Sequence, residues 1–260
     1  MKNILSFKLF IESVITDPKR LLEPKIKHFL EQIELYNCGK HIWTIKINDQ
    51  QSRAMVFLRS QEYFESPFDK IVGKQFKISD YIDIYKEQNK KQEFSYGADW
   101  EGFNIPSTIL EECMFNIPSD EMNNYDKIML SIIATIKNHE KDRYYLLGVD
   151  TLDKTVLEHE FAHAMYFTIP EYKIEMDELT IKCENNIKKE ISIILNNMGY
   201  IDQVFNDEFQ SYMSTGLLEL MLDIKNINTW EEKYREIFLK YYNKELYISP
   251  KEEIIWNFQK

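Results

Sequence analysis

The sequence predicts an α+β protein in which a small mixed sheet with helices is followed by an all-helical C-terminal segment. Before residue 170, short runs rich in β-branched and aromatic residues alternate with stretches of helical periodicity. From Glu171 onward, the apolar residues recur only at helical spacing. We therefore expect two lobes, an N-terminal α+β lobe over residues 1–168 and a C-terminal helical lobe over residues 169–260.

In the first part of the N-terminal lobe, capping residues indicate helix starts, and β-branched and aromatic runs indicate strands. The expected elements are a helix from Asp17-Pro18 through Ile26, Phe29, Leu30 and Ile33 toward Gly39, strands at residues 41–47 and 54–58 paired across residues 48–52, and a helix from Ser79 to Gln88. Residues 96–107 are the most loop-like part of the chain. The loop at 97–106 could overhang a cleft and receive an extended peptide, or it could be an ordinary surface loop.

The second part of this lobe should contain one strand between two helices. A helix starting at Ser119 would carry an apolar face formed by Tyr125, Ile128, Met129, Ile132, Ile133 and Ile136. Residues 143–149 predict a compact strand, and Thr151 is a suitable N-cap for the next helix. That helix must end before Pro170, because proline cannot continue it.

The C-terminal lobe should consist of three helices. The expected elements are a long helix between Glu171 and Met198 that ends at Gly199, a helix over residues 203–222, and a helix that starts at Thr229 with Glu232 at its third position.

Composition excludes several classes of function. Hydrophobic residues make up 44% of the 260-residue chain, which is too apolar for disorder and enough for a sizeable core. The formal net charge of −11 opposes nucleic-acid binding, and the basic stretch Lys86–Lys91 is interrupted by Glu87, as in a solvated helix face. No apolar run approaches the ~20 residues of a membrane span.

The cysteines and the N-terminus indicate the compartment. Cys38, Cys113 and Cys183 are odd in number and far apart, so neither a disulfide framework nor a cysteine zinc site is expected. Lys8 and Glu12 interrupt the apolar N-terminus, which argues against a signal peptide. We expect a cytoplasmic protein, or one exported by a route without an N-terminal signal peptide.

One motif carries chemistry, the segment His159-Glu160-Phe161-Ala162-His163. Histidines at positions i and i+4 lie on one helix face, so both imidazoles can reach a single ion. Zinc accepts neutral imidazole nitrogens, and Glu160 could reach a metal-bound water without ligating the metal. The alternative is that two helix histidines lie near glutamates by chance.

These residues resemble the zincin metallopeptidases, a family recognised by HExxH on its active-site helix. The resemblance covers about residues 140–220. The chain differs from the metzincin branch, because neither a glycine nor a third histidine follows the motif before Pro170. The remaining histidines, His28, His41 and His139, all lie upstream and are expected to be surface or core residues.

A carboxylate is therefore expected as the third ligand, as in the gluzincin branch. That branch places the ligand glutamate after Asn and before Ser and Asp at positions +3 and +4. Here Glu208 would be the ligand and Ser211 matches, but Asp207 replaces the Asn and Tyr212 replaces the Asp. The missing Asp leaves the hydrogen-bond partner of His159 unassigned.

Other assignments stay open for the third ligand and for the oxyanion donor. Glu208 could instead be an ordinary surface glutamate, with Glu175 or Asp177 as the next candidates. Tyr200 and Tyr212 are both suitably spaced to stabilise the oxyanion of a tetrahedral intermediate, although either could serve packing alone.

The sequence thus predicts a zinc-dependent metallopeptidase with one Zn²⁺ per chain and a peptide or protein substrate. Its zinc-activated water would attack the peptide bond with Glu160 as general base. The alternatives are a non-peptidase zinc hydrolase and a non-enzymatic, zinc-stabilised protein-interaction module. A closed coordination sphere without an open water position would favour the second.

Overall fold

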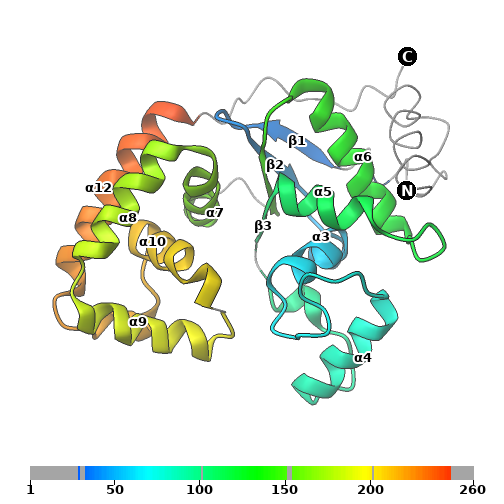
Figure 1. The fold of residues 1–260 in the computed structure, drawn as a ribbon, viewed down its shortest axis with the longest axis horizontal. Helices are drawn as coiled ribbons and strands as arrows, with labels where there is room; N and C mark the ends of the chain where they lie inside the picture. Colours follow the sequence, from blue (N-terminus) through cyan, green and yellow to red (C-terminus); the bar gives the residue numbers. More distant parts are fainter. Residues whose placement is uncertain (1–28, 30–32, 101, 151–153, 201, 247–260) are drawn as a thin grey trace.

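The structure is a computed structural model that describes residues 29, 33–100, 102–150, 154–200 and 202–246 (Figure 1). The expected helix start at Asp17-Pro18 and the expected cap Thr151 lie outside these residues. No described helix is long and apolar enough to cross a membrane.

A four-stranded mixed sheet forms the centre of the described chain. Its strands in spatial order are β1 (Glu34–Asn37), β2 (Ile42–Lys46), β4 (Tyr145–Val149) and β3 (Phe103–Pro106). β2 and β4 are parallel, whereas β1 pairs with β2 and β3 pairs with β4 in antiparallel fashion. The predicted α+β class with a small mixed sheet is confirmed.

The two faces of this sheet pack into two separate hydrophobic cores. Because side chains alternate along a strand, Leu146 of β4 faces one core and its neighbours Tyr145 and Leu147 face the other. Helices α3 (Gln50–Glu65), α4 (Ile78–Asn89), α5 (Ser107–Phe115) and α6 (Asn124–His139) supply the first core. The second core contains α7 (Lys154–Thr168) and the C-terminal helices, which lie on the other side of the sheet (Figure 1).

The C-terminal part is helical, as predicted, but it contains more breaks than expected. Its helices are α8 (Pro170–Lys182), α9 (Asn185–Asn197), α10 (Phe205–Thr215), α11 (Glu219–Leu222) and α12 (Ile227–Glu245). The expected long helix is interrupted after Lys182, where Cys183 and Glu184 adopt extended backbone. The expected helix over 203–222 is interrupted at Gly216, whose φ of 144° is incompatible with helix.

The predicted strand at residues 54–58 is wrong, because this segment belongs to helix α3. Asp49 caps the helix by accepting a hydrogen bond from the Ser52 amide (2.7 Å), so residues 48–52 start a helix instead of forming a hairpin turn. The Arg53 guanidinium then donates to the carbonyl of Ile47 (2.8 Å), which ties the helix to the end of β2.

The helix expected to run toward Gly39 is also wrong in its last part. Residues Glu34–Asn37 form β1, and Leu35 lies opposite Ile45 of β2. The chain reverses through Gly39, Lys40 and His41, all of which have positive φ. This tight hairpin lets β1 bury its apolar side chains against β2, which a helix at this position could not do.

Three other boundaries differ from expectation at capping positions. α6 begins at Asn124 because Asn123 and Asp126 form a capping box, so Ser119 lies in the preceding turn. Lys77 precedes α4 in place of the expected cap Ser79, and α12 starts at Ile227, two residues before Thr229. The expected strand at 143–149 and the helix ends before Pro170 and Gly199 are confirmed to within two residues.

The division into lobes at residue 168 stays a prediction. Within the described residues, α7 packs in the same core as α8, α9, α10 and α12, and it also covers the sheet. The expected surface loop at 96–107 contains a 3₁₀ turn at Tyr96–Ala98 and the edge strand β3.

A substitution at Gly148 tests how β3 is held in place. Gly148 lies opposite Phe103 of β3, and a Cβ atom at Gly148 would clash with the ring of Phe57, which stacks on Phe103 at 5.1 Å. We expect Gly148→Ala to lower the free energy of unfolding by about 1–3 kcal/mol, measured by urea denaturation. Phe57→Leu should cost stability alone but relieve part of the Gly148→Ala effect, and strictly additive effects would contradict this packing.

Candidate metal centre

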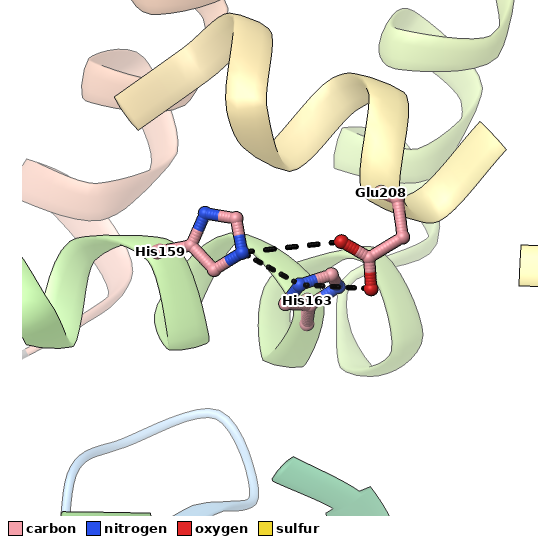
Figure 2. A group of neighbouring side chains, drawn as sticks. All are labelled: His159, His163 and Glu208. Carbon is pink, nitrogen blue, oxygen red and sulfur yellow. Dashed lines mark hydrogen bonds and ion pairs between the residues drawn. The ribbon is translucent and has the colours of Figure 1, made fainter. Parts of the chain in front are cut away.

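The motif histidines lie on α7, on the face that looks toward α10 (Figure 2). One helical turn separates His159 from His163, and their Nε2 atoms lie 3.2 Å apart. Glu208 reaches toward them from α10, with Oε1 3.7 Å from Nε2 of His163 and Oε2 4.0 Å from Nε2 of His159. Donor atoms of the three residues all lie within 4.8 Å of one another.

The other ring nitrogen of each histidine contacts an oxygen atom of α10. Nδ1 of His163 lies 3.0 Å from Oδ1 of Asp207 and 3.2 Å from the Ser211 hydroxyl. Nδ1 of His159 lies 3.3 Å from the Thr215 hydroxyl, which donates its own proton to the carbonyl of Ser211. Both Nδ1 atoms are therefore placed to donate, which leaves the two Nε2 lone pairs facing the same space.

This arrangement fits a cation. Two nitrogen lone pairs at 3.2 Å repel one another unless a proton or a metal ion lies between them. Glu208 is only 5% exposed, and its buried Oε2 accepts no hydrogen bond within the described chain. Two imidazoles and one carboxylate form a donor set that suits zinc.

The charges around His163 favour a proton on its ring. Burial alone would lower the pKa of His163, but the carboxylates of Asp207 and Glu208 raise it to about 10. Burial and the charge of His163 lower the pKa of His159. Burial raises the pKa of Glu208 to about 7, although the charge of His163 opposes this rise. A proton on His163 therefore balances the buried carboxylates near neutral pH.

Glu160 is buried beside the donor group and is held by the edge strand β3. The Asn104 amide donates to Oε2 of Glu160 (2.9 Å), and the Tyr145 hydroxyl donates to Oδ1 of Asn104 (2.6 Å). Gly102 lies so close that a Cβ atom there would clash with Oε1 of Glu160. Burial raises the pKa of Glu160, with the charge of His163 opposing.

The two candidate tyrosines come together at the same place. The hydroxyls of Tyr200 and Tyr212 lie 3.4 Å apart, and the Tyr212 ring lies 4.7 Å from the ring of His159. Burial raises the pKa of both, so the hydroxyls stay protonated and able to donate near neutral pH. Their role toward an oxyanion stays a prediction.

A cavity of about 930 Å³ opens beside these residues. His159, Glu160, His163 and Glu208 form part of its wall, and both tyrosines line it. Asp99, Trp100, Gly102, Phe103 and Asn104 line the same cavity, and the last of these donates to Glu160. The loop-like segment therefore borders the cavity, and its role in receiving a peptide stays a prediction.

Glu175 and Asp177, the alternative candidates for the third ligand, interact with other side chains. Glu175 pairs with Lys240 (2.6 Å) and accepts from the Tyr241 hydroxyl, whereas Asp177 pairs with Lys173 and Tyr166. Neither belongs to the donor group around His159. A second cluster of possible donors, His41, Glu140 and Asp142, lies away from the cavity, where His41 and Glu140 form an ion pair (2.8 Å).

Three residues of the site had no predicted role. Asp207 and Thr215 lie at positions i and i+8 of α10 with Ser211 between them, and this i, i+4, i+8 stripe is visible in the sequence. Asp207 occupies the position where the gluzincin pattern has Asn, and Thr215 fills the partner role of His159 that was left unassigned. For Asn104 the only signal is strand alternation, which turns it away from its buried neighbours Phe103 and Ile105.

Comparisons of the chain with protein-family models, with curated proteins and with solved structures gave no match.

A zinc titration of single variants tests the donor group. We expect close to one zinc per chain. Loss of a residue that only hydrogen-bonds to a metal ligand typically weakens metal affinity by ~10- to 100-fold. We expect His159→Ala, His163→Ala and Glu208→Ala each to weaken zinc affinity by more than that, because each removes a ligand. Glu175→Ala and Asp177→Ala are the matched controls and should bind zinc normally. Elemental analysis without bound zinc, and no uptake on addition, would exclude the metal centre.

The pKa of His163 predicts that zinc binding releases a proton. Because His163 keeps its proton up to a pKa of about 10, zinc must displace that proton at lower pH. Zinc affinity should therefore rise about tenfold per pH unit above pH ~7 and level off toward the pKa of His163. Calorimetry in two buffers of different ionisation enthalpy measures the released proton directly, and a value near zero at pH ~8 would contradict the charge arrangement.

Proposed function

We propose that the chain is a zinc-dependent metallopeptidase with a gluzincin-like site, in which Glu160 is the general base. The observation that carries the proposal is the convergence of three metal donors, from α7 and α10, beside a buried glutamate on the wall of a cavity. His159, His163 and Glu208 would hold the ion. Three protein ligands are typical of a catalytic zinc site, whereas a structural site usually has four.

When bound, zinc would supply a Lewis acid that lowers the pKa of a water molecule toward ~7 and polarises a substrate carbonyl. The remaining chemistry belongs to the chain. Glu160 would take a proton from the attacking water and pass it to the leaving amine. Burial raises the pKa of Glu160 toward the neutral pH at which the enzyme would work, which favours proton transfer both to and from its carboxylate.

Asn104 supports this role by orienting the base. Its amide holds Oε2 of Glu160, and Tyr145 fixes the amide in turn, so the carboxylate has one preferred direction. The hydroxyls of Tyr200 and Tyr212 are donors on the same cavity, and either could stabilise an oxyanion.

The edge strand favours a peptide as substrate. β3 pairs with β4 on one side, and no described strand pairs with its other side. An extended peptide could add to such an edge through main-chain hydrogen bonds. Gly102, Phe103 and Asn104 line the cavity at this edge, so a peptide bound there would run past Glu160.

The two alternatives differ from this proposal in what they require. A non-enzymatic zinc module would be expected to close the coordination sphere, whereas the described donors number three and border a cavity. A non-peptidase hydrolase could use the same donors and base, but it would gain nothing from an edge strand beside the base.

Glu160→Gln tests the catalytic proposal. We expect this variant to keep its zinc and its fold but to lose activity by ~10²- to 10⁴-fold, because the amide preserves the shape and cannot accept the proton. Activity is measured by adding the zinc-loaded protein to a proteome-derived peptide mixture and identifying new termini by mass spectrometry. Glu178→Gln, an exposed site on α8, is the matched control and should cleave as the wild type does.

Two outcomes would count against the assignment. If Glu160→Gln cleaves at a near wild-type rate, Glu160 is not the base. If the wild type carries zinc but yields no new termini from any peptide, the peptidase proposal fails and the hydrolase and structural alternatives stand.

A further inference from the structure

The cavity extends from the metal centre to a second polar region on α3. We call this region the acidic end and define it by Glu62 and Glu65 of α3 with Tyr81, Tyr85 and Tyr96, all of which line the cavity. Neither glutamate belongs to a group of three described donors close enough to share a metal ion. The proposed function leaves both carboxylates unused.

Glu62 is buried without a sufficient partner. It is 4% exposed, and its buried Oε2 accepts no hydrogen bond from any described residue. Oε1 of Gln61, which is 3% exposed, is likewise buried without a partner, and both residues line the cavity. Burial raises the pKa of Glu62, although nearby hydroxyls such as those of Ser66 and Tyr81 oppose the rise. A buried carboxyl oxygen without a partner is costly, so Oε2 of Glu62 can accept one further donor.

Glu65 adds a second carboxylate toward the metal centre. Its Oε2 accepts a hydrogen bond from the Gln61 amide (3.0 Å). Burial, with a smaller contribution from the negative charge of Glu208, raises the pKa of Glu65 to about 8. Glu65 is therefore the member of the acidic end that interacts electrostatically with the donor group of the metal centre.

Apart from His163, whose charge opposes the rise in the pKa of Glu65, the described cavity wall offers these two carboxyl groups no cationic side chain. Its described lining contains neither lysine nor arginine. Asp99, a third acid of the lining, differs because Lys91 pairs with it (3.2 Å) and Tyr85 donates to it. Glu62 and Glu65 of the acidic end thus lack a lysine or arginine partner within the described lining, and burial favours their neutral, protonated forms until a cation binds.

Aromatic rings complete the acidic end. Tyr81 makes edge contacts with Tyr96 (5.8 Å between ring centroids) and Phe94 (6.2 Å), and it lies 6.2 Å from Tyr85. Ring faces attract cations, and a planar guanidinium or an aliphatic stem packs well against them. Carboxylates between aromatic rings are therefore a chemically matched site for a lysine or arginine side chain.

We propose that the acidic end is a specificity subsite that binds a basic side chain of the peptide substrate. The inference rests on the proposed function, because it assumes that the chain cleaves peptides. The cavity that contains the acidic end is also lined by Glu160 and by Phe103 and Asn104 of β3. A basic side chain would give Glu62 its missing partner and would place positive charge between Glu62 and Glu65. The preferred substrates are then peptides with lysine or arginine near the bond that is cleaved.

A binding experiment tests the subsite without any catalysis. The probes are Nα-acetyl-arginine amide and its neutral isostere Nα-acetyl-citrulline amide, titrated into the zinc-loaded full chain and followed by NMR or calorimetry. We expect the arginine probe to bind about 10-fold tighter or more, because charge-assisted hydrogen bonds exceed neutral ones. Glu62→Gln should reduce this ratio to about 1–3, whereas Glu87→Gln, an exposed site on α4, should leave it unchanged.

Thermal unfolding shows whether a variant that loses binding is still folded. Glu62→Gln removes a buried ionisable group and keeps its shape, so we expect its Tm to equal or exceed that of the wild type. If Glu62→Gln fails to fold, Glu65→Gln replaces it and should also lower the ratio. Equal binding of the two probes to the wild type, or a ratio unchanged in a folded Glu62→Gln or Glu65→Gln variant, would overturn the subsite.

A cleavage experiment separates failure of the subsite from failure of the proposed function. Peptides that differ only by arginine, lysine, citrulline or norleucine at one position are compared by kcat/KM in wild type and Glu62→Gln. A preference for the basic residues that disappears in Glu62→Gln supports both proposals. Cleavage without such a preference overturns the subsite alone. Absence of all cleavage, together with Glu62-dependent binding of the arginine probe, overturns the peptidase function and leaves a cation-binding site.

Discussion

The contact between His163 and α10 is the interaction on which the site depends. His163 is 2% exposed, and its ring lies between Asp207 on one nitrogen and the His159–Glu208 pair on the other. A buried imidazole with carboxylates on both sides has a favourable state only if it carries a proton or faces a metal ion. This requirement fixes the rotation of α10 against α7, and with it the positions of Glu208 and Thr215.

The sequence predicted which side chains gather at this site better than it predicted the elements around them, whereas the chemistry of the site stays a prediction. The spacing of His159, Glu160 and His163 is a local property of one helix, and the apolar face of the C-terminal helices is likewise periodic, so both were predictable. Glu208 followed from a resemblance, and its position near the histidines agrees with that expectation. The partner Asn104 was not predictable, because its contact with Glu160 depends on the pairing of β3 with β4.

The strand wrongly predicted within α3 has a physical origin. Helix α3 carries buried polar residues such as Arg53, Arg59 and Glu62, so its sequence lacks the apolar stripe that identifies an ordinary surface helix. Arg59 pairs with Asp126 of α6 (2.9 Å), which is 67 residues away and cannot be read from a local window. Arg53 donates to the Ile47 carbonyl, a contact that forms only when the helix packs at the end of β2. Buried polar groups on a helix thus weaken the pattern on which prediction relies.

The contact of Gly102 with Glu160 couples the start of the edge strand mechanically to the Glu160 carboxylate. Because Gly102 has no side chain, its backbone packs directly on Oε1 of Glu160, and the Asn104 amide donates a hydrogen bond to Oε2. Under the proposed function, a peptide that pairs along β3 would also stiffen the support of the base. Binding energy from contacts far from the scissile bond would then raise kcat instead of tightening substrate binding. Long peptides would therefore be cleaved with a higher kcat than short ones.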